Sequence, residues 1–360
     1  MNYEREKPVR NVRGYNAMKH LTDQTMLGNI TMKNRFVRAA VGDSTNEGHL
    51  TENNIELYRK LAEGGAALLI SGFSVVDAQE QSDHTFSMAD DALIPEYQHL
   101  TQVIHKAGSK IVAQLVYLSG FVPAPRPLAP SAGKNKYTGI ETFEMTGDEI
   151  HQMVRLFADA ARRAKEMGFD GVELHAAHGF LHHQFFSPMW NHRTDCYGGT
   201  VENRSRFLIE TYEAVREVVG SGFPIMMKLS LDDVPAEDWL YLARQLDERG
   251  IDAVETSGNW MAHAPKDRTY YHDAAATLAR ELRCAVIQTG GNREFATLEE
   301  QLNASDIAYF AFARPFMSEP DFVNKYLRGE IQKPRCLSCN FCVRNPQNIC
   351  VFEKDKLKKE

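Results

Sequence analysis

The sequence lacks the features expected of a membrane, secreted or nucleic-acid-binding protein. It has no apolar run long enough to cross a bilayer. Its first residues, MNYEREKPVRNVRGYNAMKH, are polar and contain no apolar core of the kind found in secretory signals. The net charge of −7 and the pI near 6.0 have the wrong sign for a general nucleic-acid surface. We therefore expect a cytoplasmic protein that binds neither membranes nor nucleic acid.

A glycine-rich dinucleotide motif, internal repeats and low-complexity tracts are also missing. No G-x-G-x-x-G opens any helix pattern, which argues against an open, doubly wound sheet that binds a dinucleotide. Hydrophobic residues make up 43% and charged residues 25% of the chain, as in ordinary globular proteins. The 360 residues are enough for one large domain or two small ones.

Short apolar runs alternate with amphipathic stretches from about residue 35 to residue 328. The runs predict strands at 35–41, 67–71, 110–115, 171–174, 224–229, 253–256, 285–289 and 307–310. The amphipathic stretches predict helices at 52–63, 95–107, 148–167, 201–219, 236–249, 274–282, 297–303 and 320–327. Four of these helices precede a glycine that we expect to be a left-handed cap: Gly64, Gly108, Gly168 and Gly250.

Eight strand–helix units favour an α/β fold of the closed (β/α)8 TIM barrel type over an open, doubly wound sheet. We place the barrel in residues 1–330 and a short cysteine-containing tail in residues 331–360. Residues 119–145, with four prolines between Pro123 and Pro130, are interpreted as a long loop over the barrel mouth. Chemistry in this fold lies on the loops that follow the strands, and several polar residues and glycines occur there.

Two groups of residues that follow predicted strands are candidates for a functional site on chemical grounds. Gly290-Gly291-Asn292 follows the seventh predicted strand and Ala313-Arg314 the eighth, where this fold commonly binds phosphate. The alternative is that the glycines only turn the chain. His175 and His178 follow the fourth predicted strand and are compatible with metal ligation, a structural role in the core, or binding of a carbonyl oxygen.

Gln114 and Lys228 end the third and fifth predicted strands. An amide offers a donor and an acceptor to the edge of a flat ring, and a cation can stabilise negative charge that develops on it. The structural alternatives are a polar strand end for Gln114 and a lysine paired with a carboxylate for Lys228. A lysine at a barrel strand end also fits a Schiff-base aldolase.

Residues 169–207 contain H-A-A-H-G, S-P-x-x-N-x-R-T-D-x-Y-G-G and E-N-R-x-R-F. This stretch resembles the old yellow enzyme family, the FMN-dependent NADH:flavin oxidoreductases and NADH oxidases, which are related to the barrel domain of 2,4-dienoyl-CoA reductase. The resemblance covers most of residues 25–345. It implies an FMN oxidoreductase that takes hydride from NAD(P)H and passes it to an activated alkene such as an enone, a quinone or a flavin.

The resemblance also implies roles for single residues. His175 and His178 would be catalytic, holding the carbonyl oxygen of the acceptor. Arg314 and the two glycines would hold the FMN phosphate. The full set of implied cofactor-binding residues is Ala39, Ala40, Val41, Gly72, Gln114, Lys228, Ser257, Gly258, Gly290, Gly291, Asn292, Ala313 and Arg314. The family's usual A-P-M is A-A-V here, and its Q-L-x-H-x-G-R is Q-L-V-Y-L-S-G.

Phe180 is the main departure from the family pattern. The family commonly reads H-G-Y at this point, and that tyrosine protonates the α-carbon of the alkene after hydride transfer. Phenylalanine has no proton to give, so either another group supplies it or alkene reduction is not the native reaction. The candidate replacements are water and four side chains, Tyr117, Tyr270, Tyr271 and His182.

The tail reads C-L-S-C-N-F-C, with Cys350 further on. Four thiolates, from Cys336, Cys339, Cys342 and Cys350, could hold a [4Fe–4S] cluster or Zn²⁺. The larger dienoyl-CoA reductases and amine dehydrogenases carry such a cluster after the barrel, but the last spacing here is shorter than in their pattern. Free reduced thiols are an equally good interpretation.

Three functions remain open from the sequence: the oxidoreductase, the Schiff-base aldolase based on Lys228, and a non-catalytic flavin-binding redox sensor. A small-molecule electron acceptor is the expected partner, and a homo-oligomer is left open. Colour separates the three, because an aldolase would be colourless and a sensor would be yellow without turning over NAD(P)H.

Overall fold

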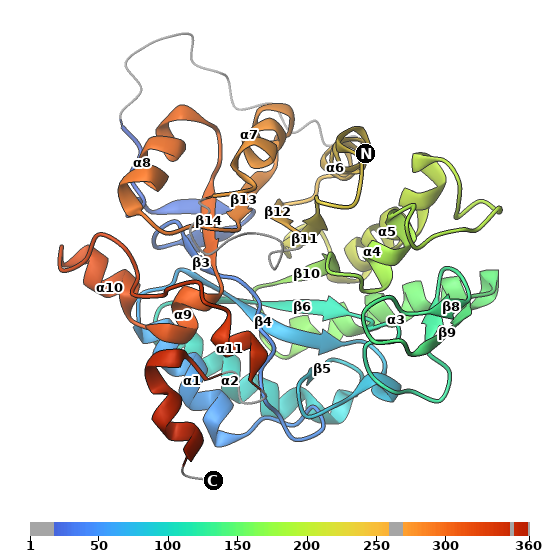
Figure 1. Ribbon diagram of the computed structural model, residues 1–360, viewed down its shortest axis with the longest axis horizontal. Helices are drawn as coiled ribbons and strands as arrows, with labels where there is room; N and C mark the ends of the chain where they lie inside the picture. Colours follow the sequence, from blue (N-terminus) through green and yellow to red (C-terminus); the bar gives the residue numbers. More distant parts are fainter. Residues whose placement is uncertain (1–17, 259–268, 346–348, 359–360) are drawn as a thin grey trace.

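The computed structural model describes residues 18–258, 269–345 and 349–358. Eight parallel strands form a closed barrel in which β3 pairs with both β14 and β4. In chain order the strands are β3 (Phe36–Arg38), β4 (Leu68–Val75), β6 (Lys110–Val116), β10 (Gly171–Ala176), β11 (Ile225–Ser230), β12 (Ala253–Ser257), β13 (Ala285–Thr289) and β14 (Tyr309–Phe312). The predicted (β/α)8 barrel is confirmed (Figure 1).

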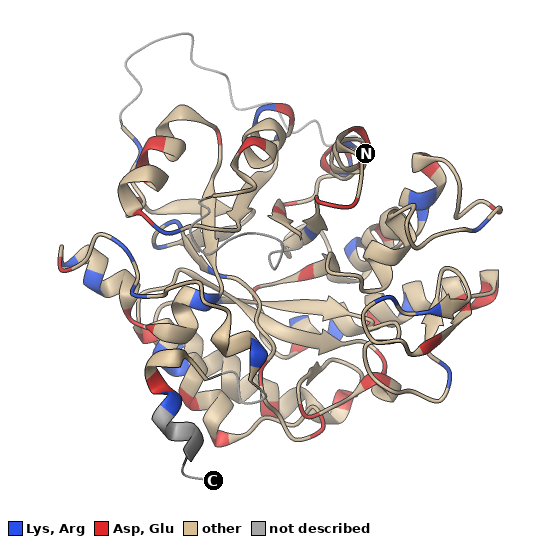
Figure 2. Ribbon diagram, in the orientation of Figure 1, with Lys and Arg blue, Asp and Glu red and all other residues tan. Residues whose placement is uncertain are grey.

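Amphipathic helices cover the outside of the barrel, each burying one face against the strands. They are α1 (Glu52–Glu63), α2 (Ile94–Lys106), α3 (Gly147–Glu166), α5 (Val201–Val219), α6 (Ala236–Glu248), α7 (His272–Glu281), α8 (Phe295–Ala304) and α10 (Phe322–Leu327). Two short helices were not predicted, α4 (Leu181–Phe186) and α9 (Arg314–Ser318), because five or six residues are too few to show a helical period. In the view of Figure 2, acidic and basic residues are interspersed over these outer helices.

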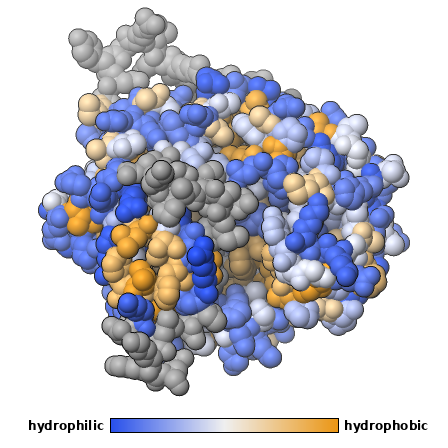
Figure 3. All heavy atoms as spheres, in the orientation of Figure 1, coloured by the Kyte–Doolittle hydropathy of each residue, from blue (hydrophilic) through white to orange (hydrophobic). Residues whose placement is uncertain are grey.

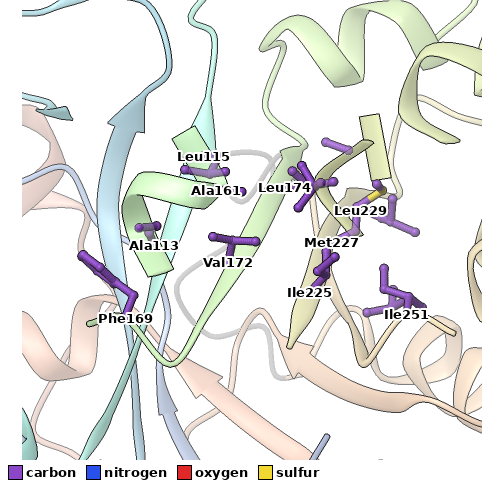
Figure 4. Close-up of a cluster of buried hydrophobic side chains, with 14 of the residues drawn as sticks. Ala113, Leu115, Ala161, Phe169, Val172, Leu174, Ile225, Met227, Leu229 and Ile251 are labelled. Atoms are coloured by element: carbon purple, nitrogen blue, oxygen red, sulfur yellow. The ribbon is translucent and has the colours of Figure 1, made fainter. Parts of the chain in front are cut away.

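Side chains that point alternately to the two faces of each strand separate residues of the outer core from residues of the site. Val172 and Leu174 of β10 point outward and pack beside Ile225, Met227 and Leu229 of β11 (Figure 4). Since successive side chains of a strand point to opposite faces, the intervening residues of β10 point into the barrel. A second apolar cluster fills one end of the interior, where the hairpin β1 (Thr25–Leu27) and β2 (Ile30–Met32) meets inward-facing strand residues. The polar inward residues are therefore left at the other end.

Two strands end three or more residues away from the predicted boundary. β3 ends at Arg38, so Ala39–Val41 leave the strand. β4 continues to Val75 because Ser74 and Val75 pair with β5 (Phe86–Ser87) and with β6, across an irregularity between Ile70 and Phe73. These pairings join residues that are separated in the chain. An apolar run of four or five residues does not indicate them, so the end of β4 could not be predicted from it.

One of the four predicted left-handed caps is wrong. Gly64 has φ −70°, and the positive φ of +104° falls on Gly65 instead. A Cβ on Gly64 would lie 2.1 Å from the carbonyl oxygen of Pro320, so this glycine permits a close approach rather than a left-handed turn. The other three caps have φ between +75° and +85°, as predicted: Gly108, Gly168 and Gly250.

The predicted loop at 119–145 contains a small sheet made of β7 (Leu128–Ala129), β8 (Gly133–Lys134) and β9 (Glu141–Glu144). The tail contains α11 (Phe341–Arg344) and a short 3-10 helix at Val351–Lys358, and it lies beside α9 (Figure 1). Apolar side chains of the tail, Leu337, Val343 and Phe352, are exposed, and Figure 3 shows apolar surface gathered over this part of the molecule. Among the described residues, no helix combines the length and apolar character that a membrane span requires.

Candidate active site

A cavity of about 390 Å³ opens at the end of the barrel where the strands terminate. Thirteen of the fifteen residues predicted to bind cofactor or substrate line it. They are Ala39, Ala40, Val41, Gln114, His175, His178, Lys228, Ser257, Gly290, Gly291, Asn292, Ala313 and Arg314. The barrel therefore gathers into one site residues that are spread over more than 270 positions of the sequence.

Gly72 and Gly258 stand behind the wall of the cavity. The N–H of Gly72 donates to the hydroxyl of Tyr58 at 3.0 Å, and a Cβ there would come within 2.8 Å of the carbonyl oxygen of Val41. A Cβ on Gly258 would come within 2.3 Å of the Tyr271 hydroxyl. Both glycines allow neighbouring segments to approach closely, and contact of either with a cofactor stays a prediction.

His175 is the penultimate residue of β10, and His178 lies in the sharp loop that follows. His178 has φ +61° and Gly179 has φ +85°, two consecutive left-handed residues. The N–H of Gly179 donates to Nδ1 of His183 at 2.9 Å, and Nε2 of His183 lies 2.9 Å from Oδ1 of Asp233. This pair ties the loop to the end of β11, and sequence reasoning missed it. The sequence contains one indication of this pair, because His183 follows the H-A-A-H-G motif by about one helical turn.

His175 is buried, His178 is half-buried, and their rings lie close together. Their ring centroids are 5.1 Å apart with the planes at 88°, and Nε2 of His178 lies 2.8 Å from Oγ of Ser257. Burial lowers the pKa of His175 well below its ordinary value and that of His178 to about 3, with nearby Lys228 adding to both effects. Both imidazoles are neutral at pH 7, and each carries one N–H. Nδ1 of His175 is buried without a protein partner.

Lys228 and Gln114 form the floor of the cavity together with buried carboxyl groups. Nζ of Lys228 donates to Oε1 of Glu255 at 2.7 Å, so the paired lysine foreseen as the structural alternative is present. Nε2 of Gln114 donates to Oε2 of Glu173 at 2.6 Å, which leaves Oε1 of Gln114 buried and without a partner. Lys228 and Gln114 line the cavity and the two glutamates do not.

The other end of the cavity is formed by Gly290, Gly291 and Arg314. The glycines have φ +112° and +75°, and a Cβ on either would come within 2.5–2.6 Å of atoms of residues 269–271. Arg314 donates to the Tyr270 hydroxyl at 3.3 Å and, in the tail, to the carbonyl oxygen of Ser338 and to Oδ1 of Asn340. The tail thus reaches the predicted phosphate site.

Asn292 has a structural role in this arrangement. Its Nδ2 donates to the carbonyl oxygens of Gln288 and Ala311, at 2.8 and 2.9 Å, and thereby joins the ends of β13 and β14. Two tail residues, Ser338 and Val343, also line the cavity and were missed from the sequence. The cysteines around them dominate the pattern of the tail and give no hint of this contact.

Phe180 is buried and is not among the residues that line the cavity. Its ring lies against those of Phe73, Phe121 and His175, at centroid distances of 5.0, 4.6 and 4.9 Å. The four candidate replacements for the family's tyrosine divide into two groups. Two of them line the cavity, Tyr270 and Tyr271, and two do not, Tyr117 and His182.

The tail cysteines do not form a ready metal site in the part of the chain that the structure describes. Three thiols are buried, those of Cys336, Cys342 and Cys350, whereas Cys339 is exposed. No group of three or more His, Cys, Asp or Glu side chains that could hold a metal occurs among the described residues. The present arrangement does not fit a cluster or zinc ion, and metal binding by the tail stays a prediction.

Buried neutral donors around a cavity at the carboxyl ends of eight parallel strands define a barrel enzyme that binds a polar ring. Residues 25–332 match the NADH:flavin oxidoreductase / NADH oxidase family, and the chain belongs to this family. It is 31% identical to a metal reductase of Desulforamulus reducens over 90% of this chain and 51% of the relative. It is 34% identical to an NADPH dehydrogenase of Bacillus velezensis over 85% of this chain and 94% of the relative.

Among solved structures, morphinone reductase in complex with tetrahydroNAD superposes with a TM-score of 0.77 at 26% identity, over 87% of this chain and 92% of that one. The chain spans about half the length of several curated relatives, including the metal reductase. The family match covers the whole barrel, so the similarity includes every strand that contributes to the cavity.

FMN is the cofactor of this family, and the residues present fit it. Gly290 and Gly291 form a cradle that a Cβ would fill, beside the cationic Arg314. Oε1 of Gln114 and Nδ1 of His175 are buried polar atoms of cavity residues that lack protein partners, as expected where a ligand supplies them.

Proposed function

We propose that the protein is an FMN-dependent oxidoreductase that takes hydride from NAD(P)H and passes it to a small acceptor with a conjugated carbonyl group. The observation that carries this proposal is the pair of neutral imidazoles of His175 and His178, which line the cavity beside unpartnered polar atoms of its floor. The relatives named NADPH dehydrogenase and morphinone reductase support it. FMN, when bound, supplies a centre that accepts hydride from the nicotinamide and gives it to the acceptor.

The protein's own residues would hold the cofactor at two points. Arg314, Gly290 and Gly291 would bind the phosphate through a charge-assisted pair and backbone N–H groups. Gln114 would bind the ring edge with its amide, and Lys228 would place a cation where negative charge develops. We assign Ala39–Val41 and Ser257 to the wall around the ring, with Ser257 also holding the His178 imidazole.

His175 and His178 would orient and polarise the acceptor. Because both rings are neutral, each can donate one N–H to the carbonyl oxygen without carrying a full charge into a buried site. Negative charge builds on that oxygen as hydride reaches the β-carbon, so donors already in place lower the barrier. The same two donors would bind a phenolate, which resembles the charged oxygen.

The acceptor class follows from Phe180. An enone needs a proton at its α-carbon, whereas the oxygens of a quinone can take protons from solvent. Since the ring at position 180 cannot donate a proton, we infer that quinones are reduced at least as readily as enones. Tyr270 and Tyr271 are the tyrosines that line the cavity, and they are the candidates for protonating an enone.

A Schiff-base aldolase is disfavoured because Lys228 is held in an ion pair with Glu255 at 2.7 Å and its amine is not free to attack a carbonyl. The proposal is tested with purified protein. Heat denaturation should release stoichiometric FMN and no FAD, and anaerobic NAD(P)H should bleach the bound flavin. Colourless protein that cannot be reconstituted with FMN would refute the assignment. Bound FMN that NAD(P)H fails to bleach would favour the redox sensor.

A further inference from the structure

Two glutamates lie directly beneath the floor of the cavity. Glu173 of β10 and Glu255 of β12 are fully buried, with 0% of each residue exposed. Each accepts a hydrogen bond from a residue that lines the cavity, Gln114 at 2.6 Å and Lys228 at 2.7 Å respectively. The barrel register explains this placement, because Glu173 pairs with Gln114 and Lys228 with Glu255 across neighbouring strands. The glutamates thus hold the two side chains that face the ring.

The charges of this buried group do not balance if both glutamates are ionised. Lys228 contributes one positive charge, while the neighbouring His175 and His178 are neutral. Two carboxylates would leave a net negative charge in the core with the like charges in contact, which is strongly unfavourable in a dry interior. A single proton on one of the two carboxyl groups removes the imbalance.

The hydrogen bonds indicate where this proton lies. One oxygen of each carboxyl group, Oε1 of Glu173 and Oε2 of Glu255, has no partner when both groups act only as acceptors. The two buried carboxyl groups are close enough for the charge of Glu255 to act on Glu173, and a carboxylate cannot donate a hydrogen bond. A proton on either group therefore completes the network.

Glu173 is the group that carries the proton. Glu255 accepts from two donors, Nζ of Lys228 at 2.7 Å and the Thr289 hydroxyl at 2.6 Å, whereas Glu173 accepts only from the neutral amide of Gln114. Burial and the charge of Glu255 raise the pKa of Glu173 well above its ordinary value. Burial is also the largest single effect on Glu255 and raises its pKa, but the charge of Lys228 and the hydrogen bonds that Glu255 makes together outweigh it, so the pKa of Glu255 is lowered.

We propose that Glu173 and Glu255 form a proton-holding site in which Glu173 carries one proton at neutral pH and donates it to Glu255. The site makes the floor of the cavity neutral overall and fixes Lys228 and Gln114 in their orientations. Its role towards the ring rests on the proposed function. Glu173 and Glu255 are positioning residues, since neither lines the cavity. An ionised Glu173 would instead oppose the field of Lys228 and repel negative charge that develops above the floor.

The test counts charges on the FMN-bound protein by isoelectric focusing. Glu173→Gln replaces a neutral carboxylic acid with a neutral amide of similar shape, so the isoelectric point should stay at the wild-type value. Glu255→Gln should also leave it unchanged, because Glu173 then ionises beside Lys228. The matched control is Glu141→Gln at an exposed position of β9. This variant should shift the isoelectric point by the amount that corresponds to the loss of one negative charge. A shift of Glu173→Gln equal to that of the control would overturn the proposal.

Infrared difference spectra provide a second measurement. Wild-type protein minus Glu173→Gln at neutral pH should contain the carbonyl stretch of one protonated carboxyl group, and its absence would overturn the proposal. If Glu173→Gln fails to fold, the isoelectric point of Glu255→Gln tests the proposal instead. An unchanged isoelectric point supports the shared proton, and a shift equal to that of the Glu141→Gln control refutes it. Neither measurement depends on turnover of NAD(P)H, so failure of the proposed function would leave both results interpretable.

Discussion

At the residue scale, the chemistry that we propose for the cavity depends on two N–H donors. We predict that His175→Ala or His178→Ala slows reoxidation of the reduced enzyme by an enone by roughly a hundredfold, the usual loss when one donor to a developing oxyanion is removed. Phenol binding should weaken in parallel, while FMN content stays near the wild-type value. Stopped-flow reoxidation measures the rate, and His178→Asn, which keeps a donor, serves as the control. Wild-type rates in both alanine variants would make the histidines structural.

Arg314 is the residue on which cofactor affinity should depend most. Arg314→Ala removes a charge-assisted hydrogen-bond partner of the phosphate, and we expect FMN binding to weaken by about 1.5–3 kcal/mol. Arg314→Lys keeps the charge but loses the planar guanidinium group, so its affinity for FMN should lie between those of the wild type and Arg314→Ala. Fluorescence titration of the apoprotein with FMN measures both constants. Equal affinity in all three proteins would place the phosphate elsewhere.

We predict that Phe180 determines which acceptors are reduced efficiently. General acid catalysis contributes roughly a hundredfold to ten-thousandfold, so restoring a hydroxyl with Phe180→Tyr should raise enone turnover far more than quinone turnover. The ring lies directly against His175, at 4.9 Å between centroids, beside the place where we propose that the acceptor carbonyl binds. Reoxidation by cyclohexenone and by a quinone is compared in the two proteins.

Rapid cyclohexenone reduction by the wild type, with no gain in Phe180→Tyr, would mean that another group supplies the proton. Tyr117, one of the candidates from the sequence, does not line the cavity. Tyr271 lines the cavity and donates to Oδ2 of Asp232 at 2.5 Å, and it becomes the first residue to mutate. Tyr271→Phe should then slow enone reduction specifically.

At the scale of elements, the sequence predicts strands and helices well where the apolar period is long. It predicts them poorly where the boundary of an element depends on pairing between segments far apart in the chain. α3 and α5 were predicted almost to the residue, because each has about five turns and a threonine cap. β4 was predicted too short, since its last residues are held by β5 and β6. Most of the candidate site was predictable because strand ends meet in a barrel, whereas the His183–Asp233 pair depends on the fold of a loop.

Helix α4 contains a histidine that should make the fold sensitive to acid. His182 is buried between the rings of Phe157 and Phe207, and neither of its nitrogens has a partner. Burial lowers its pKa from the ordinary 6.5 to about 3. As the pH falls below 6.5, the unfolded chain gains a proton that the folded protein cannot accept, so stability is lost between these two values.

We expect this residue to lower the free energy of unfolding by roughly 2 kcal/mol between pH 7 and pH 5. His182→Leu should remove that part of the acid sensitivity and leave stability at pH 7 little changed. Urea unfolding of both proteins at the two pH values measures the difference. The same pH dependence in the variant would assign the acid loss to other groups, of which His175 and His178 are the nearest candidates.

At the scale of the whole molecule, barrel and tail share the cavity. Ser338 and Val343 line it, and Asn340 accepts a hydrogen bond from Arg314. The tail therefore closes the end where we place the phosphate and holds the arginine that would bind it. The cysteines lie in this same segment, so any change in their chemistry would act on the mouth of the cavity rather than at a distant surface.

The last prediction follows from this contact. Deleting the residues after 332, where the family match ends, should make FMN dissociate faster. The deletion opens the cavity to water and releases Arg314 from its fixed orientation, and we expect about a tenfold effect, equivalent to one hydrogen bond of about 1.4 kcal/mol. Asn340→Ala removes the contact with Arg314 alone and should produce a smaller effect in the same direction. Dissociation is followed by the rise in flavin fluorescence after dilution. If the truncated and full-length proteins release FMN at the same rate, the tail does not help to hold the cofactor, and the barrel loops alone retain it.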